Sequence, residues 1–232
     1  MFKQTIKAII KRNFIEPIRR ALFGDVDDMV RDYQNIRKYI EWLESGKPIP
    51  SPHIIKEVTV KEYANKYRLK IFVETGTYLG EMVYAVRSLF DKIYSIELGD
   101  KLCERVKTKF SKYNHISILH GDSAEVLPEI LHHIKEPCLF WLDAHYSEGI
   151  TAKGKLITPI LQELDHIFNH PVKDHVILID DEKDFTGKGG YPTIQQLRSL
   201  VLSQGSDYEF EVKGDIIRIH KREKLSCFLK KQ

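Results

Sequence analysis

Acidic side chains stand at, or just after, the end of every apolar run that could form a core strand. In an open α/β sheet, ligands bind outside the carboxyl ends of the strands, so acids at these ends would face one shared pocket. Carboxylates in such a pocket can accept hydrogen bonds from ribose hydroxyls or bind a hard cation. Short polar residues are also common where strands turn, which is the competing explanation. The acids are Glu74, Glu97, Asp122, Asp143, Asp180 and Asp181.

A glycine-containing turn follows the first of these runs, in Val73-Glu74-Thr75-Gly76-Thr77-Tyr78-Leu79-Gly80. Glycine lets the backbone approach a ligand closely, and the start of the next helix offers unpaired N–H groups. The turn therefore predicts a nucleotide-like cofactor, although a plain loop after a strand has the same pattern. Glu97 lies 23 residues beyond Glu74, a spacing that suits a ribose contact. The alternative for Glu97 is a charge at the N-terminus of a helix that begins near Gly99.

Asp143, Asp180 and Asp181 form a second acidic group after the fourth and fifth predicted strands. Clustered carboxylates repel one another unless a cation or a proton relieves them. Carboxylate oxygens suit a hard divalent cation such as Mg²⁺. His145 and Tyr146 come just after Asp143 and can reach the same pocket. A hydrogen-bonded loop histidine is the alternative for His145.

The elements that must position these side chains alternate along the chain. Strands are predicted over 70–74, 92–97, 116–120, 138–143 and 176–180. Helices are predicted over 79–90, 99–112, 123–134, 158–168 and 193–203. This alternation is typical of a parallel sheet with right-handed crossovers, and strands at 208–212 and 216–220 predict a final antiparallel hairpin. The predicted fold is α/β, a Rossmann-like seven-stranded, mostly parallel sheet with an antiparallel terminal hairpin and an N-terminal helical extension.

Composition limits the class of protein. The chain has 232 residues, of which 42% are hydrophobic, enough for one sizeable domain with an appendage. Three scattered cysteines fit a reducing compartment, so a cytoplasmic location is expected. The net charge of +3 comes from basic residues at the two ends of the chain, which does not indicate a nucleic-acid-binding face. No apolar run is long enough for a membrane span.

The predicted domains are an N-terminal helical extension and linker (1–52), the main domain (53–222) and a basic tail (223–232). Within 1–23, apolar residues at helical spacing oppose a lysine-bearing face. This pattern predicts either peripheral contact with the inner face of a membrane or a helix packed on its own protein. A second helix over 27–44 carries a heptad-like apolar stripe that is compatible with a homodimer.

Several motifs resemble class I S-adenosylmethionine (SAM)-dependent methyltransferases, above all the metal-dependent O-methyltransferases of the catechol, caffeoyl-CoA and macrolide-sugar types. The matching segments are Val73–Gly80, Ser95-Ile96-Glu97, His120-Gly121-Asp122-Ser123, Phe140–His145 and Leu178-Ile179-Asp180-Asp181. The resemblance covers about residues 58–221. It implies a SAM site at Glu74, Gly76, Thr77, Tyr78, Gly80, Glu97, Asp122, Ser123 and Asp143, and a metal site, expected to hold Mg²⁺, at Asp143, Asp180 and Asp181.

The chain departs from this pattern at two positions. Catechol-type enzymes have a lysine as base just after the metal-binding acid, whereas this chain has no lysine between Asp143 and Lys153. His145 is therefore the expected base, acting beside the catalytic metal ligand Asp143. Asp181 replaces a common asparagine, which is more similar to the sugar-modifying branch. The expected transferase reaction is O-methylation of a hydroxyl on a sugar, a glycan or another small molecule, for example in polysaccharide biosynthesis.

Two other functions stay open from the sequence. A catalytically degenerate methyltransferase fold could serve as a partner protein at a membrane surface. A metal-dependent phosphoesterase could use the second acidic group, but it would leave Glu74 and Glu97 without a role. A dehydrogenase is disfavoured because the turn lacks the tighter G-x-G-x-x-G pattern. Candidate acceptor-binding aromatic residues are Tyr33, Trp42, Tyr146, Phe185 and Tyr191.

Overall fold

A computed structural model of the chain describes residues 26–144 and 158–222. The chain divides into two units, Met1–Ile55 and Lys56–Gln232. The predicted helix over 1–23, the basic tail, His145 and Tyr146 lie outside the described residues. None of the helices in the two described ranges combines the length and the apolar character that a bilayer crossing needs.

The second unit is built on a seven-stranded sheet with the order β3-β2-β1-β4-β5-β7-β6. Neighbouring strands from β3 to β5 are parallel, and β7 pairs antiparallel with both β5 and β6. This arrangement confirms the predicted α/β fold and the antiparallel terminal hairpin. The strands are β1 (Ile71–Thr75), β2 (Lys92–Glu97), β3 (Ile116–His120), β4 (Leu139–Leu142), β5 (Val176–Ile179), β6 (Tyr208–Lys213) and β7 (Ile216–Lys221).

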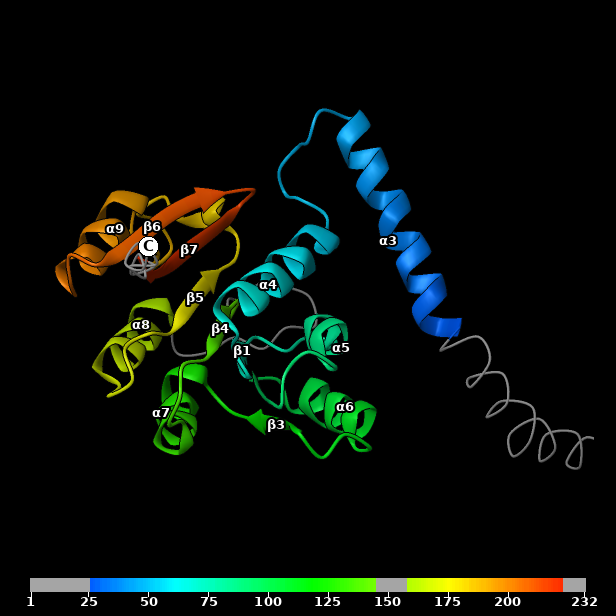
Figure 1. The fold of residues 1–232 in the computed structure, drawn as a ribbon, viewed down its shortest axis with the longest axis horizontal. Coiled ribbons are helices and arrows are strands. Elements are labelled where there is room, and N and C mark those ends of the chain that lie inside the picture. Colours follow the sequence, from blue (N-terminus) through cyan, green and yellow to red (C-terminus); the bar gives the residue numbers. More distant parts are fainter. Residues whose placement is uncertain (1–25, 145–157, 223–232) are drawn as a thin grey trace, which may run out of the picture. The chain divides into compact units, whose positions relative to one another are not determined.

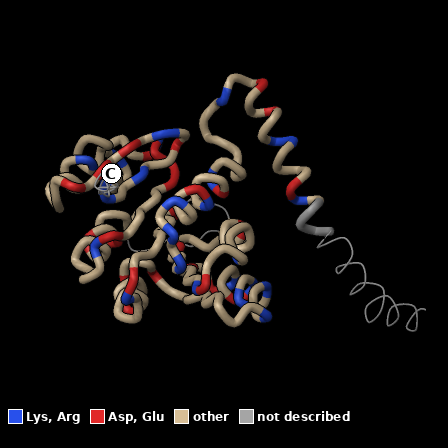
Figure 2. Tube along the Cα trace, viewed as in Figure 1, with Lys and Arg blue, Asp and Glu red and all other residues tan. Residues whose placement is uncertain are grey.

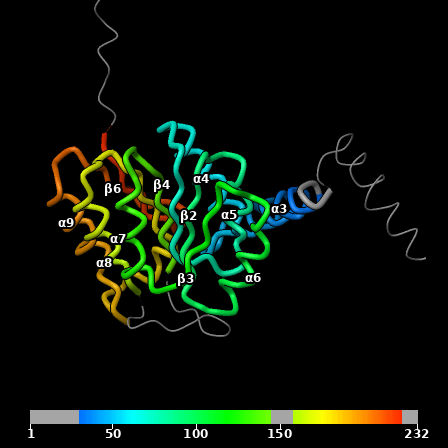
Figure 3. Tube along the Cα trace, turned by 90° about the horizontal axis from the view of Figure 1, so that it is seen from below, coloured from blue at the N-terminus to red at the C-terminus, as the bar shows by residue number. Residues whose placement is uncertain are grey.

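Helices cover both faces of the sheet, as Figures 1 and 3 show. Apolar residues of α4, α5 and α6 form one buried cluster with the sheet, and those of α7, α8 and α9 form the other. The central strands β4 and β5 are buried along their whole length, which explains their continuous apolar sequences. The helices are α4 (His53–Tyr67), α5 (Glu81–Val86), α6 (Asp100–Phe110), α7 (Ser123–His133), α8 (Ile160–Asn169) and α9 (Ile194–Ser203).

Helix α4 is the element that the sequence pattern did not predict. Its sequence, HIIKEVTVKEYANKY, is rich in β-branched residues, which have a low helix propensity. Glu57 and Thr59 are buried together with Val60, so polar and apolar side chains share the covered face. Hydrophobic periodicity is therefore weak, and packing against the sheet stabilises a helix that local propensity does not favour.

The first unit contains helix α3 (Val26–Glu44), as predicted over 27–44. The helix ends at Ser45-Gly46, where Gly46 has a positive φ of 85° and the N–H of Lys47 donates to the carbonyl of Trp42 at 3.0 Å. This left-handed glycine is a common way for a helix to end. Four members of the predicted apolar stripe are exposed, namely Tyr33, Ile36, Ile40 and Leu43.

Charged residues of both signs are interspersed along the described helices and strands (Figure 2). In the second unit, for example, α6 carries both Glu104 and Lys107, whose side chains pair at 3.0 Å. The expectation that the protein does not bind nucleic acid stays a prediction from composition.

A buried histidine pair lies at the edge of the sheet where β4 and β5 begin. The backbone N–H of Cys138 donates to Nδ1 of His175 at 3.1 Å. Nε2 of His175 is therefore left to donate to Nδ1 of His170 at 3.0 Å, and Nε2 of His170 donates to the carbonyl of Leu131 at 3.0 Å. Each ring thus accepts at Nδ1 and donates at Nε2. Burial, and then His170, lower the pKa of His175 to about 4.

Candidate functional site

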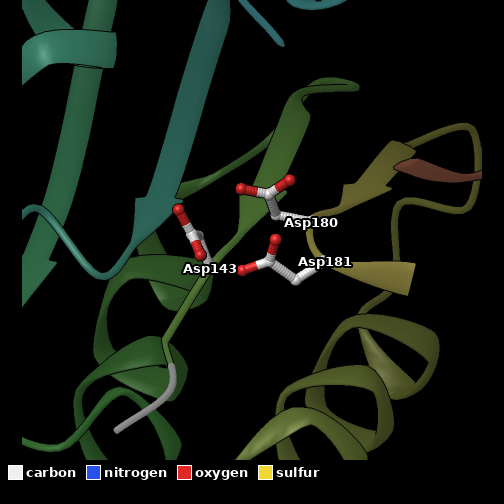
Figure 4. Close-up of side chains that lie close together, drawn as sticks. All are labelled: Asp143, Asp180 and Asp181. Carbon is white, nitrogen blue, oxygen red and sulfur yellow. The ribbon is translucent and has the colours of Figure 1, made fainter. Parts of the chain in front are cut away.

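The three predicted metal ligands lie together at the carboxyl edge of the sheet. Leu142 and Ile179 are paired in the register of β4 and β5, and Asp143 and Asp180 directly follow them. Asp181 is the next residue. One carboxylate oxygen from each acid lies within 4.8 Å of those of the other two. Figure 4 shows the three carboxylates converging, and we call this group the acid cluster.

Asp180 is the most deeply buried member of the acid cluster, with a side chain that is 1% exposed. Its Oδ1 atom has no hydrogen-bond partner among the described residues. Burial, and then the neighbouring Asp143, raise the pKa of Asp180, and the ammonium of Lys56 opposes the rise. The buried oxygen without a hydrogen-bond partner and the two further carboxylates together offer oxygen ligands, which Mg²⁺ prefers. These residues therefore fit the predicted cation.

The backbone of Asp181 has left-handed dihedral angles, with φ 53° and ψ 55°. Non-glycine residues rarely adopt this conformation, although aspartate and asparagine tolerate it best. The loop is held by the turn of the β6–β7 hairpin. There, Asp215 accepts hydrogen bonds from the N–H of Glu182 at its carbonyl and from the N–H of Lys183 at its carboxylate, both at 3.1 Å.

Two lysines that the sequence pattern did not predict as site residues contact the acid cluster. The ammonium of Lys56, on α4, donates to Oδ2 of Asp180 and lies 3.9 Å from Oδ1 of Asp181. The ammonium of Lys183 donates to Oδ1 of Asp181. Lys56 lies 124 residues before its partner, so no sequence spacing could have revealed the contact.

The predicted cofactor turn touches the acid cluster through its backbone. Gly76 has a φ of 86°, and a Cβ atom there would lie 2.5 Å from the carbonyl oxygen of Asp143. The N–H groups of Gly76 and Thr77 donate to the carbonyl of Ile96 at 3.0 and 3.1 Å. The turn after β1 is thus fixed between the ends of β2 and β4, and only glycine fits its closest approach.

Glu97 braces this turn. Its Oε2 atom accepts the N–H of Tyr78 at 2.7 Å, and its Oε1 atom accepts the N–H of Gly99 at 2.8 Å. Both predicted roles are compatible with this geometry. The contact with Gly99 lies at the N-terminus of α6, and each carboxylate oxygen can still accept a second hydrogen bond from a ligand hydroxyl.

Glu74 lies beneath the turn, 2% exposed, where its Oε2 atom accepts the hydroxyl of Ser95. That hydroxyl also contacts the hydroxyl of Thr77. Burial raises the pKa of Glu74 to about 8, with Ser95 opposing the rise. A protonated Glu74 can donate a hydrogen bond, which is a property the sequence pattern did not suggest.

The other predicted cofactor residues flank this edge. Asp122 caps α7, because its Oδ1 atom accepts the N–H of Ala124 at 3.0 Å. Gly80 has a φ of 68° at the start of α5 and packs against the ring of Phe110, where a Cβ would meet it at 2.7 Å. Ser123 is buried beside Glu163, a carboxyl on α8 that the sequence analysis missed. Burial raises the pKa of Glu163 to about 7.

A small cavity of about 10 Å³, roughly the size of one water molecule, lies beside the acid cluster. Two of the predicted acceptor-binding aromatic residues, Phe185 and Tyr191, line it with ring centroids 5.2 Å apart. Tyr33 and Trp42 belong to the other unit and are not part of this lining. Its further lining residues are Leu142, Asp143, Ala144, Thr158, Ile160, Glu163, Ile179 and Asp180.

In sequence, the chain matches no protein-family model and no curated protein. In structure, it resembles an O-methyltransferase from Bacillus cereus in complex with SAH, with a TM-score of 0.55, 13% identity, and coverage of 80% of this chain and 91% of that one. A putative caffeoyl-CoA O-methyltransferase from Staphylococcus aureus has a TM-score of 0.55 and 12% identity, with coverage of 92% of this chain and 100% of that one. The O-methyltransferase TomG from Streptomyces achromogenes, in complex with SAM, has a TM-score of 0.54 and 14% identity, with 80% and 87% coverage. The second unit therefore has the fold of class I methyltransferases.

Proposed function

We propose that this protein is a SAM-dependent O-methyltransferase that uses a divalent metal ion, with Mg²⁺ as the expected ion. The observation that carries the proposal is the contact between Gly76 and the carbonyl of Asp143. It brings the cofactor turn and the acid cluster side by side at the carboxyl edge of one sheet, where this fold binds ligands. A methyl donor and an acceptor hydroxyl would then meet between them.

The cofactor half of the site depends on a braced turn. Glu97 accepts a hydrogen bond from the backbone of Tyr78. Its carboxylate oxygens can each accept a further hydrogen bond, which suits its predicted role of binding the ribose. Asp122 and Ser123, at the start of α7, are proposed to flank the adenine. The rigid turn would place the donor in one orientation, which is the main contribution a protein can make to methyl transfer.

The acceptor half depends on the acid cluster. Asp143, Asp180 and Asp181 would hold the metal ion, and Oδ1 of Asp180 is ready to bind it because it has no partner among the described residues. When bound, the metal ion lowers the pKa of an acceptor hydroxyl. His145 is the proposed base, as its imidazole can take a proton near neutral pH.

We further propose that the acceptor is a hydroxyl of a sugar or glycan. Tyr191 is half-buried, packs edge-on against the buried Phe185 and lines the small cavity beside the acid cluster, and an aromatic ring can pack against the apolar face of a sugar. Asp181 stands where catechol-type enzymes commonly have asparagine, and this supports a similarity to the sugar-modifying methyltransferases. The proposal also includes a cytoplasmic location, peripheral membrane contact through residues 1–23 and a homodimer formed through α3.

Calorimetric titration with SAM, with and without Mg²⁺, tests the cofactor half. We expect SAM binding in both conditions; an absence of binding in both would reject the proposal. Candidate sugar and glycan acceptors can then be screened for the mass increase of one methyl group. The Asp143→Ala, Asp181→Ala double variant, assayed in chelator, should lose methyl transfer, and full transfer by it would reject the metal half of the proposal.

One observation favours a second candidate, a catalytically degenerate fold that acts as a partner protein. Lysine ammonium groups already contact Asp180 and Asp181, so the acid cluster has internal counter-ions. This candidate predicts that SAM and Mg²⁺ both fail to bind in the same titrations. A phosphoesterase would instead bind Mg²⁺ without SAM.

A further inference from the structure

Lys56 places a positive charge against the acid cluster from a helix to which the proposed function assigns no role. It lies in the first turn of α4, whereas its partners follow β5. The ammonium donates to Oδ2 of Asp180, and the contact is nearly dry, because the two side chains are 16% and 1% exposed. A lysine that is mostly withdrawn from water needs such partners to stay charged.

The contact uses only one of the two oxygens of Asp180. Oδ2 bonds the ammonium, while Oδ1 has no hydrogen-bond partner among the described residues. The ammonium also lies 3.9 Å from Oδ1 of Asp181. Lys56 therefore neutralises part of the cluster but leaves its deepest oxygen available.

We propose that Lys56 is a built-in cation of the acid cluster, which competes with a divalent metal ion and lowers the affinity of the site for it. The inference rests on the metal half of the proposed function, because the same three carboxylates bind the ion. Lys56 stabilises the cluster when no ion is bound. A divalent ion captures both oxygens of Asp180 only when the ammonium gives up Oδ2.

Electrostatics gives the direction of the effect. An ammonium within a few ångströms of a divalent cation repels it, and the repulsion is strong where the surroundings are mostly dry. Removing the charge while keeping the hydrogen bond should strengthen metal binding. If Lys56 only oriented Asp180, the same change would leave the affinity unchanged or weaken it.

The test is a Mn²⁺ titration of the full-length protein, in which free Mn²⁺ is measured by electron paramagnetic resonance. Lys56→Gln keeps a donor for Asp180 and removes the charge, so we expect Mn²⁺ to bind at least about tenfold more tightly than in the wild type. Lys56→Arg keeps the charge and should stay near the wild-type affinity. Lys61→Gln, on the same helix but paired with Glu57 at 3.5 Å, is the matched control and should also match the wild type.

Unchanged or weaker binding by Lys56→Gln would overturn the inference, as would an absence of Mn²⁺ binding in every variant. Lys56→Met provides a second uncharged variant if the glutamine variant misfolds, and circular dichroism checks the folding of each. A Mn²⁺-dependent rise in melting temperature that is larger in the uncharged variants gives an independent readout. SAM titration separates this result from the proposed function, since the cofactor half does not require Lys56.

Discussion

Gly76 lies against the backbone carbonyl of Asp143, so the turn after β1 and the end of β4 are in van der Waals contact. Because the contact is made by backbone atoms, it does not depend on the charge of the Asp143 side chain. The two halves of the proposed site can therefore be altered separately, by substitutions that change either the turn or the carboxylates.

Substituting Gly76 with alanine should disrupt the cofactor half. The new Cβ would lie 2.5 Å from a backbone oxygen that cannot rotate away, on a residue with a φ of 86°. We expect SAM binding to be lost, measured by calorimetry, and the free energy of unfolding to fall by about 2–4 kcal/mol, measured by urea denaturation. Gly190→Ala is the control, since it has the same φ of 86° but open space around its Cβ. Equal effects of the two substitutions would show that backbone strain, and not the contact, is responsible.

The Glu97→Gln substitution should weaken SAM binding without unfolding the domain. A glutamine has one accepting oxygen, so either the N–H of Tyr78 or that of Gly99 loses its partner. We expect the dissociation constant for SAM to rise about tenfold or more, since hydrogen bonds to charged groups contribute about 1.5–3 kcal/mol. Glu104→Gln, at an exposed position on the following helix, should bind SAM like the wild type. A Glu97→Gln protein with unchanged affinity would contradict the proposed role.

Asp181 should tolerate asparagine but not alanine. Asparagine offers a carbonyl oxygen as a metal ligand and accepts left-handed dihedral angles, whereas alanine offers no ligand and is strained at a φ of 53°. We expect methyl transfer by Asp181→Asn to stay within about tenfold of the wild type and that by Asp181→Ala to fall more than about a hundredfold. Initial rates at saturating SAM and Mg²⁺ measure both. Similar rates for the two variants would rule out Asp181 as a metal ligand.

The pair of buried histidines predicts a loss of stability in acid. The pKa of His175 is about 4 in the folded chain, below the usual value near 6.5, so the unfolded chain binds the proton first as the pH falls. The contribution of His175 to the free energy of unfolding is fully present above pH 6.5 and declines as the pH falls toward 4. At pH 5 the free energy of unfolding is lower by about 2 kcal/mol. His175→Asn should be less stable than the wild type at pH 7 but show a flatter slope between pH 7 and 5 in urea denaturation. His120→Asn, with a side chain 44% exposed, should keep the wild-type slope, and an unchanged slope in His175→Asn would refute the assignment.

The sequence predicts the sheet well because strands alternate with helices that have a clear apolar face. The residues 92–97 and 116–120 are strands with the predicted bounds, and the acids after β4 and β5 meet because parallel strands end at one edge. Helix α4 was missed since its stability comes from tertiary packing. Lys56 was missed with it, because a contact between residues far apart in the chain leaves no local pattern.

The roles of individual carboxyl groups were harder to predict than their positions. Glu74 and Glu97 are both predicted to contact the cofactor, and the sequence did not show that Glu74 is buried below the turn. Nor did it show that Glu97 accepts one backbone N–H from the turn, that of Tyr78, and one from Gly99 at the start of α6. Glu163 follows no strand, so the rule that identified the other acids could not find it. Its burial depends on the packing of α8 against the sheet.

The turn of the terminal hairpin has a consequence for how the protein is made. Asp215 holds the loop that carries Asp181, and β7 covers the edge of β5 next to Asp180. Both contacts come from the last part of the domain to be synthesised. A nascent chain that still lacks the hairpin would have an unpaired edge at β5 and an unanchored acid loop. The acid loop should therefore reach its final conformation only once the hairpin has been synthesised and has paired with β5.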